Sequence, residues 1–143
     1  MSRDLASGMP DESMQVRVRP VVRDDAATWE SLRRDLWPEG AESHASEIES
    51  FFAGTLEEPA AVLVAEGLTR AIVGFAELSI RTDIPGLEGK RVGYVEGLYV
   101  IPAVRQQGIA RKLLHASRGW ARKQGCDAFA SDRAERIVID RSF

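Results

Sequence analysis

Short apolar runs separated by turn-forming residues predict several strands along this chain. Residues 60–65 and 71–80 are strand-like and are separated by Glu66-Gly67, which predicts an antiparallel hairpin. Residues 94–101 are dense in apolar, β-favouring side chains, as in a strand buried on both faces, and Pro102 ends this run. Shorter apolar runs predict further strands at residues 16–22, 126–130 and 137–139.

Three other stretches repeat apolar residues at the helical period. Their apolar positions are Trp29, Leu32 and Leu36, then Ile48, Phe51 and Phe52, and finally Ile109, Leu113, Ala116 and Trp120. Asp24 or Asp25 can cap the first helix, Pro38 closes it, and Gly125 stands where the third would end. This order of elements predicts an α/β fold of the α+β kind, a mostly antiparallel sheet with helices packed on it.

Length and composition limit the classes of protein to which the chain can belong. Its 143 residues suit one domain, which we predict spans residues 14–143, after a polar leader over residues 1–13 that we predict is disordered. The leader lacks the apolar segment of a secretory signal, and no apolar run approaches membrane-spanning length, so no membrane partner is expected. A net charge of −3 with dispersed Lys and Arg argues against a nucleic-acid partner.

Cysteine and histidine are scarce in this sequence. Cys126 is the single cysteine, so an internal disulfide is impossible, and we expect a buried structural thiol and a cytoplasmic location. His44 and His115 are too isolated to form a metal site, which needs several clustered ligands. We therefore predict no metal and place both histidines on the surface or on a helix face.

The turn between the 94–101 strand and the third helix carries the first candidate chemistry. It reads Arg105-Gln106-Gln107-Gly108-Ile109-Ala110, a basic stretch with a glycine beside the start of a helix. The glycine allows close approach of the backbone, and the unpaired N–H groups of a helix N-terminus favour an anion such as phosphate. The turn matches neither the Walker loop nor the dinucleotide G-x-G-x-x-G motif. An ordinary tight bend relieved by glycine is the alternative.

Glu96 is the second candidate, because it is a carboxylate within an otherwise apolar strand. Burying a carboxylate is costly unless it is paired or hydrogen-bonded, and Gly97 beside it leaves room for a ligand. An outward-facing or salt-bridged glutamate is the alternative interpretation.

The pattern Arg105-x-x-Gly108-x-Ala110 behind the strand segment Val95-Glu96-Gly97-Leu98-Tyr99-Val100 resembles the acetyl-CoA signature of the GNAT superfamily of N-acetyltransferases. A wider set is similar to the aminoglycoside 6'-N-acetyltransferases and extends from about Val16 to the C-terminus: Leu36-Trp37-Pro38, Gly74-Phe75-Ala76, Ile80-Arg81-x-Asp83, Glu96-Gly97 and Ala130-Ser131-Asp132. The resemblance implies a GNAT-like mixed sheet with helices on both faces.

It also implies acetyl-CoA as cosubstrate, held by the strand and the turn. Main-chain groups of the strand would pair with the pantetheine arm, the turn would hold the pyrophosphate, and two arginines would add positive charge. A strand N–H near Leu98 or Tyr99 would stabilise the oxyanion. The expected cofactor contacts are Leu98, Tyr99, Val100, Arg105, Gln106, Gln107, Gly108, Ile109, Ala110 and Arg111.

The resemblance further implies a site for an amine. Glu96 would orient the ammonium group and accept its proton, directly or through water. Trp37 would line the sugar pocket, although a core tryptophan is the default for this residue type. Asp132 and Glu135 would bind further amines, although ordinary solvation at a strand end is the alternative for Glu135.

The sequence departs from the family near its end, where only Arg133 and Ala134 separate Asp132 from Glu135. Family members normally carry another helix there, so the C-terminal part is shortened, and the source of the acid that protonates the thiolate is open. The last strand could be supplied to a partner in the expected homodimer, or the cofactor cleft could be partly open. Ile84 stands where the family tends to have an aromatic contact.

Three functions follow as hypotheses. The leading one is acetyl transfer from acetyl-CoA to the 6'-amine of an aminoglycoside, with resistance as the consequence. A GNAT enzyme acting on a polyamine, amino acid or peptide is the second. A non-catalytic acyl-CoA-binding module is the third.

Overall fold

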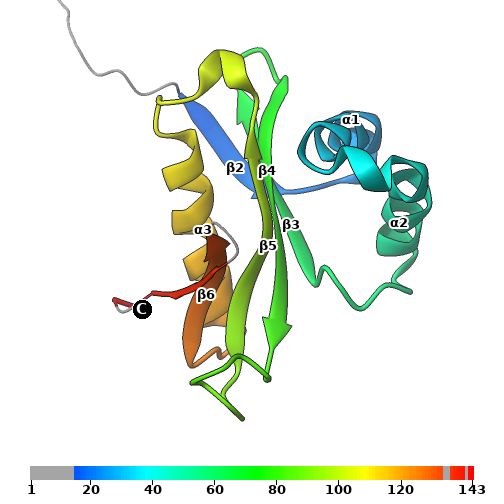
Figure 1. The fold of residues 1–143 in the computed structure, drawn as a ribbon. Helices are drawn as coiled ribbons and strands as arrows, with labels where there is room; N and C mark the ends of the chain where they lie inside the picture. Colours follow the sequence, from blue (N-terminus) through cyan, green and yellow to red (C-terminus); the bar gives the residue numbers. More distant parts are fainter. Residues whose placement is uncertain (1–14, 134–135, 141) are drawn as a thin grey trace, which may run out of the picture.

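The computed structural model describes residues 15–133, 136–140 and 142–143, which form a six-stranded sheet flanked by helices (Figure 1). The strand order is β2-β3-β4-β5-β6-β7, and only the β5–β6 pair is parallel. The strands are β2 (Val16–Pro20), β3 (Ala61–Gly67), β4 (Ile72–Arg81), β5 (Val92–Val100), β6 (Ala128–Arg133) and β7 (Arg136–Ile139). The helices are α1 (Ala26–Leu36), α2 (Ala41–Ala53) and α3 (Ile109–Lys123), with 3-10 turns at Arg23–Asp25, Pro38–Gly40 and Pro102–Val104.

Helices cover both faces of the sheet, as the resemblance implies. Figure 1 shows α1 and α2 on one side of the strands and α3 on the other. Side chains of β3 alternate between these two layers, because successive residues of a strand point to opposite faces. Val62 and Val64 pack with Trp29 of α1, whereas Leu63 and Ala65 pack with the layer under α3. The predicted mixed, mostly antiparallel fold is therefore confirmed.

The middle of β5 contains an irregularity in its pairing with β4. Gly97 lies opposite Glu77, and Val95 lies opposite Leu78, so Glu96 is an extra residue with no partner of its own across the ladder. Such a bulge bends the strand and redirects side chains. The residue that the sequence singles out therefore sits at a break in an otherwise regular ladder.

The pairing of β5 with its parallel neighbour β6 ends next to the bulge at Glu96. β5 and β6 are paired from Val92 and Ala128 to Val95 and Ser131. Beyond this point β6 is paired with β7 alone, and β5 continues along β4 to Val100. The two strands therefore separate next to Glu96. Their separation opens the sheet on the side of β5 that faces away from β4.

The C-terminal strand pairs within the chain. Arg133 of β6 lies opposite Arg136 of β7, so the two strands pair antiparallel within this chain. Phe143 stacks on Phe129 with ring centroids 5.8 Å apart, and the guanidinium of Arg122 lies 4.8 Å from the Phe143 ring centroid. These contacts hold the end of the chain against α3 and β6.

Several predictions fall outside the described residues or differ from the structure in detail. The predicted leader over residues 1–13 and the candidate Glu135 lie outside the described residues. Ile84 is only 1% exposed and packs with Val92 and Tyr94, so its side chain faces the core instead of a substrate. None of the helices in the described part of the chain has the length and apolarity needed to cross a bilayer.

Candidate active site

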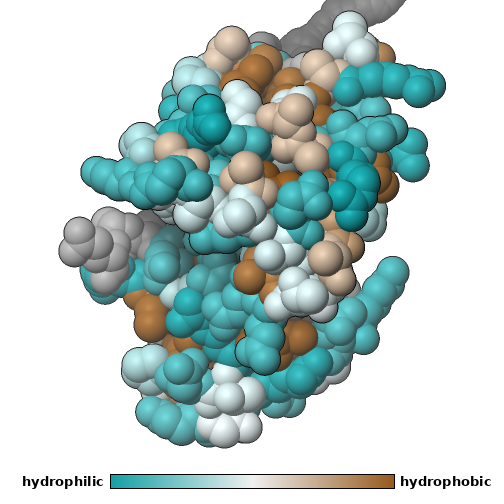
Figure 2. All heavy atoms as spheres, turned by 90° about the vertical axis from the view of Figure 1, so that its right-hand side faces the viewer, coloured by the Kyte–Doolittle hydropathy of each residue, from teal (hydrophilic) through white to brown (hydrophobic). Residues whose placement is uncertain are grey.

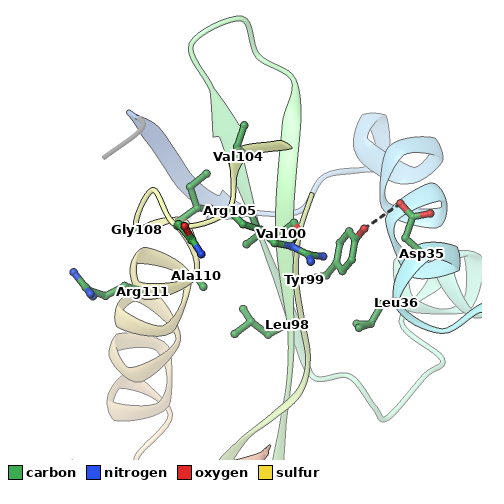
Figure 3. Close-up of a pocket in the computed structure, with 12 residues that line it drawn as sticks. Asp35, Leu36, Leu98, Tyr99, Val100, Val104, Arg105, Gly108, Ala110 and Arg111 are labelled. Atoms are coloured by element: carbon green, nitrogen blue, oxygen red, sulfur yellow. Dashed lines mark hydrogen bonds between the residues drawn. The ribbon is translucent and has the colours of Figure 1, made fainter. Parts of the chain in front are cut away.

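A cavity of about 510 Å³ lies between the end of α1, the second half of β5 and the start of α3. We call it the α3 cavity. Figure 3 shows Asp35 and Leu36 on α1 facing Tyr99 on β5, whereas Leu98 lies on the side of β5 toward α3. The Tyr99 hydroxyl donates to Asp35 at 3.4 Å. The lining of the α3 cavity includes most of the predicted cofactor contacts, namely Leu98, Tyr99, Val100, Arg105, Gln106, Gly108, Ile109, Ala110 and Arg111. Gln107 is the predicted contact that does not line this cavity.

The turn before α3 wraps its backbone around one end of this cavity. Gln106 and Gly108 both adopt left-handed conformations, with φ of 67° and 83°, and Gly108 is the residue from which α3 begins. Lys112 N donates to Gly108 O at 3.1 Å, so the N–H groups of residues 109–111 precede the first intrahelical bond. Those N–H groups and the positive end of the helix dipole suit an anion.

Arg105 is held in place beside the same turn. Its Nε donates to the carbonyl of Val100 at 2.7 Å, and its guanidinium carbon lies 5.3 Å from the ring centroid of Tyr99. Arg111 projects from the first turn of α3 and is exposed. Two cations and a helix N-terminus at one end of a long cavity fit a diphosphate-bearing cofactor.

A second cavity of about 380 Å³ lies where β5 and β6 separate, and we call it the bulge cavity. Its lining residues are Leu36, Trp37, Val95, Glu96, Gly97, Leu98, Leu114, Ser131 and Asp132. Leu36 and Leu98 line both cavities, so the two adjoin beside Leu98. The structure thus brings four predicted site residues, Trp37, Glu96, Leu98 and Asp132, to one cavity next to the predicted cofactor cleft.

Glu96 is salt-bridged in this cavity, which was the alternative interpretation of its sequence position. Its two carboxylate oxygens accept from Nε and Nη2 of Arg81, each at 2.8 Å. This pairing raises the pKa of Arg81 above its usual range. The Glu96 side chain nevertheless keeps 21% of its surface exposed and lines the cavity, so pairing and access to a ligand coexist.

Asp132 is connected to the same group through Tyr94. The Tyr94 hydroxyl donates to the Asp132 carboxylate, and burial followed by that interaction raises the pKa of Tyr94. The guanidinium of Arg81 lies 4.4 Å from the ring centroid of Tyr94. Two carboxylates on neighbouring strands are thereby held by one hydrogen-bonded and stacked assembly.

Trp37 forms a wall of the bulge cavity. It ends α1, and its ring lies directly against the backbone of β5 at Gly97, where an added Cβ would stand 2.5 Å from the ring atom Cη2. The glycine beside Glu96 therefore makes room for an aromatic ring of the same chain. Trp37 is half-buried and lines the site, so it is not a core tryptophan.

Several functional candidates were missed by sequence reasoning. Arg81 carried a signal only as part of the Ile80-Arg81-x-Asp83 match. Glu58 and Glu77 carried none, yet both line a cavity of about 190 Å³ with Trp37 and Glu96. No periodicity or motif marks Glu58 or Glu77, because their proximity to Glu96 arises only in the folded chain.

His44 lies on a face of α2, one of the two predicted positions, but this face is buried and not on the surface. Its side chain is 3% exposed and bonds to Arg33 and to the main chain of Trp37. The packing of α2 on α1 buries this side chain, and an isolated histidine in an acidic segment of sequence gives no sign of that packing. Cys126 is only half-buried, and burial raises the pKa of its thiol. Among the described residues, no three His, Cys, Asp or Glu side chains gather as a metal site requires.

Comparison with known proteins identifies the family. Residues 27–137 match the model of the acetyltransferase (GNAT) family. This chain belongs to that family. The match covers α1 to β7, so it includes both cavities and the turn before α3. GNAT membership predicted from the strand and turn motifs is confirmed, and the chain is an acetyltransferase.

Two relatives of this chain carry the same name. The chain is 46% identical to aminoglycoside N(6')-acetyltransferase type 1 of Klebsiella aerogenes, over 80% of this chain and 76% of the relative. It is 37% identical to the enzyme of that name from Serratia marcescens, over 76% and 74%. Aminoglycoside N-acetyltransferase AAC(6')-Iy, solved with CoA, is similar with a TM-score of 0.74 and 30% identity, covering 84% of this chain and 78% of that one.

Proposed function

We propose that this GNAT protein transfers the acetyl group of acetyl-CoA to the 6'-amine of an aminoglycoside, and thereby confers resistance. The observation that carries the proposal is the pair of adjoining cavities that meet at Leu98, one with a helix N-terminus and two arginines, the other with two carboxylates. Relatives named for this reaction, and a similar enzyme solved with a bisubstrate analog of CoA and acetylneamine, support it.

The α3 cavity is the proposed site of acetyl-CoA, which supplies the acetyl thioester. The N–H groups of residues 109–111 bind the diphosphate, and Arg105 and Arg111 add charge. Main-chain groups of Leu98, Tyr99 and Val100 bind the pantetheine arm as an added strand, because β6 has left this side of β5. An N–H near Leu98 donates to the carbonyl oxygen on which charge develops.

The bulge cavity is the proposed site of the amine. Trp37 forms one wall, and Glu96 and Asp132 attract and orient the positively charged sugar. Glu96 accepts a proton from the ammonium, directly or through water, and the free amine attacks the acetyl carbonyl carbon. The carbon–sulfur bond then breaks, the attacking nitrogen loses its extra proton to become an amide, and the thiolate gains a proton, so that CoA leaves as the thiol. Glu135, which lies outside the described residues, stays a predicted substrate contact.

A homodimer and a cytoplasmic location complete the proposal. β7 is at the edge of the sheet, and its Ile137 and Val138 are 42% and 41% exposed, which suits contact with a second copy. Sedimentation equilibrium tests this dimer, and a single species with the mass of the monomer would contradict it. A cytoplasmic location rests on the lone cysteine and on the need for acetyl-CoA.

Thiol release from acetyl-CoA tests the function. We expect turnover with an aminoglycoside that bears a 6'-amine and none with a matched aminoglycoside that bears a 6'-hydroxyl. Turnover only with spermidine or peptides would support a different amine substrate. Calorimetric binding of CoA without acetylation of any of these amines would support a binding module. Glu96→Gln should lose turnover while CoA still binds.

A further inference from the structure

A buried ion pair lies behind the wall of the bulge cavity. Glu77 of β4 is 2% exposed and accepts from Arg33 of α1 through Nε at 2.7 Å and Nη2 at 3.1 Å. It also accepts from Trp29 Nε1 at 2.9 Å. The remaining terminal nitrogen of Arg33, Nη1, lies 2.8 Å from Glu47 and 3.1 Å from Nδ1 of His44. One guanidinium therefore joins the sheet, α1 and α2.

The contacts of His44 determine its protonation. A guanidinium has donors and no acceptor, so Nδ1 of His44 must accept from Arg33 and cannot carry a proton. Nε2 lies 3.0 Å from the carbonyl oxygen of Trp37, which can only accept, so Nε2 must carry the proton. His44 is thus neutral, with one tautomer selected by its two neighbours.

This imidazole holds the residue that walls the site. Trp37 lies where α1 ends and before the 3-10 turn Pro38–Gly40, with φ of −128° and ψ of 72°, so its carbonyl is not part of an α-helical ladder. The carbonyl accepts from His44 and, at 3.3 Å, from Gly40 N. The Arg33 guanidinium carbon also lies 5.3 Å from the Trp37 ring centroid. Both the main chain and the ring of Trp37 therefore depend on the Arg33 assembly.

We propose that His44 is a positioning residue of the amine site: in its neutral form it links the buried Arg33–Glu77 pair to the Trp37 main chain and holds the indole against Gly97. The inference rests on the proposed function of the bulge cavity. Protonation of His44 would turn a second donor toward Arg33 and break this link. The charged groups that face His44 in the described structure are Arg33 from α1, Glu47 from α2 and, through Arg33, Glu77 from β4.

Two substitutions separate the hydrogen bonds from the space that the ring fills. His44→Gln keeps one acceptor for Arg33 and one donor for Trp37, whereas His44→Leu fills similar space with neither. We expect His44→Leu to raise KM for the aminoglycoside about tenfold, the value of a lost buried hydrogen bond, with little change in CoA affinity. His44→Gln should restore KM. His115→Leu, at an exposed position of α3, is the control for loss of a histidine. Equal KM values in the unaltered protein and His44→Leu would overturn the positioning role, as would a KM in His44→Gln that stays as high as in His44→Leu.

Fluorine NMR of protein labelled with 5-fluorotryptophan reports the environment of the Trp37 ring directly. The Trp37 resonance, assigned by its loss in Trp37→Phe, should shift in His44→Leu and return to its unaltered position in His44→Gln. Trp120 of α3 lies outside the assembly and is the internal control. A Trp37 resonance that does not shift in His44→Leu would overturn the link. Absence of turnover in the unaltered protein would overturn the proposed function instead, so the two failures are distinguishable.

Discussion

At the scale of single residues, the wall of the bulge cavity depends on the absence of a side chain at Gly97. Gly97 has no Cβ, and the ring of Trp37 occupies the space where a Cβ would come within 2.5 Å of Cη2 and 2.7 Å of Cζ2. The bulge at Glu96 aims the neighbouring carboxylate into the same cavity. The position of the Trp37 ring relative to the Glu96 carboxylate therefore depends on having glycine at position 97.

Gly97→Ala should displace Trp37. A tryptophan ring is stiff and is backed by Arg33, so it must move as a unit when the methyl group enters. We expect KM for the aminoglycoside to rise about tenfold, with CoA affinity nearly unchanged, as steady-state kinetics and calorimetry would measure. Gly119→Ala is the matched control, because a Cβ there meets nothing within 4 Å. Unchanged KM in Gly97→Ala would remove Trp37 from the amine site.

A second prediction at this scale concerns the entry to α1. The Asp25 carboxylate accepts from Arg19 at 2.8 and 3.0 Å and from Val22 N at 2.8 Å, and the residue is 8% exposed. Pairing with Arg19 and then the Val22 N–H lower the pKa of Asp25 below its ordinary value of 3.8, against the opposing effect of burial. Asp25→Asn should lower the free energy of unfolding at neutral pH by about 1–3 kcal/mol.

The sign of the pH dependence follows from the lowered pKa. A carboxylate of this kind stabilises the fold above 3.8, its unfolded value, and this stabilisation is lost as the pH falls through the lower folded pKa. Urea denaturation should therefore show the difference between Asp25→Asn and the unaltered protein shrinking on going from about pH 7 to about pH 3. The exposed neighbour Asp24 provides the control Asp24→Asn, and equal effects of the two variants would contradict the prediction.

At the scale of elements, α3 combines two roles in one helix. Its apolar side, including Leu113 and Ala121, packs on the sheet, while its N-terminus begins from a left-handed glycine beside the α3 cavity. The packing fixes the direction of the helix axis, and the turn that carries Arg105 and Gly108 leads into its first residues (Figure 3). Phosphate binding is thus proposed to depend on an element whose position is decided by the core.

Substitution of the glycines at the two ends of α3 tests this division. Gly108 and Gly125 both have positive φ, 83° and 74°, so alanine at either position should cost about 1–2 kcal/mol of stability. Gly108→Ala should also weaken CoA binding about tenfold, because it disturbs the N–H groups that face the diphosphate. Gly125→Ala should leave CoA affinity unchanged. Calorimetry measures both, and equal CoA affinities would contradict the role of the α3 N-terminus.

At the scale of the whole molecule, the site exists because the sheet opens. The separation of β6 from β5 places the two cavities side by side, and the layers on either side of the sheet each supply one flank: α1 brings Leu36, and α3 brings its N-terminus. Polar and charged residues predominate on the face that carries α1 and α2, with hydrophobic residues in scattered patches (Figure 2). The carboxylates of the bulge cavity add to a mildly acidic chain of net charge −3.

Such a charge distribution predicts a salt effect on substrate binding. Raising the ionic strength from about 0.05 M to about 0.5 M should raise KM for an aminoglycoside, because screening weakens the attraction between its amines and the acidic site. The increase should be larger for aminoglycosides with more amines on the same scaffold, at saturating acetyl-CoA in each case. An increase that does not depend on the number of amines would argue against electrostatic recognition.

The sequence alone determined the elements and the family. Strand and helix periods located β3, β4, β5 and α3 to within a few residues, because each period reflects which side chains must leave water. The turn at residues 105–110 and the Val95–Val100 segment also identified the GNAT family, because that backbone conformation is encoded locally by a glycine and its neighbours.

Only the tertiary structure decided how the site is held together. Glu96 meets Arg81, His44 is buried against Arg33, and Trp37 rests on Gly97, yet these pairs are separated by 15, 11 and 60 positions in the chain. No local pattern reports such contacts, since strand pairing, the bulge and the packing of α1 on the sheet create them. Periodicity identifies which side of an element is buried, whereas the partner that it meets there depends on the whole fold.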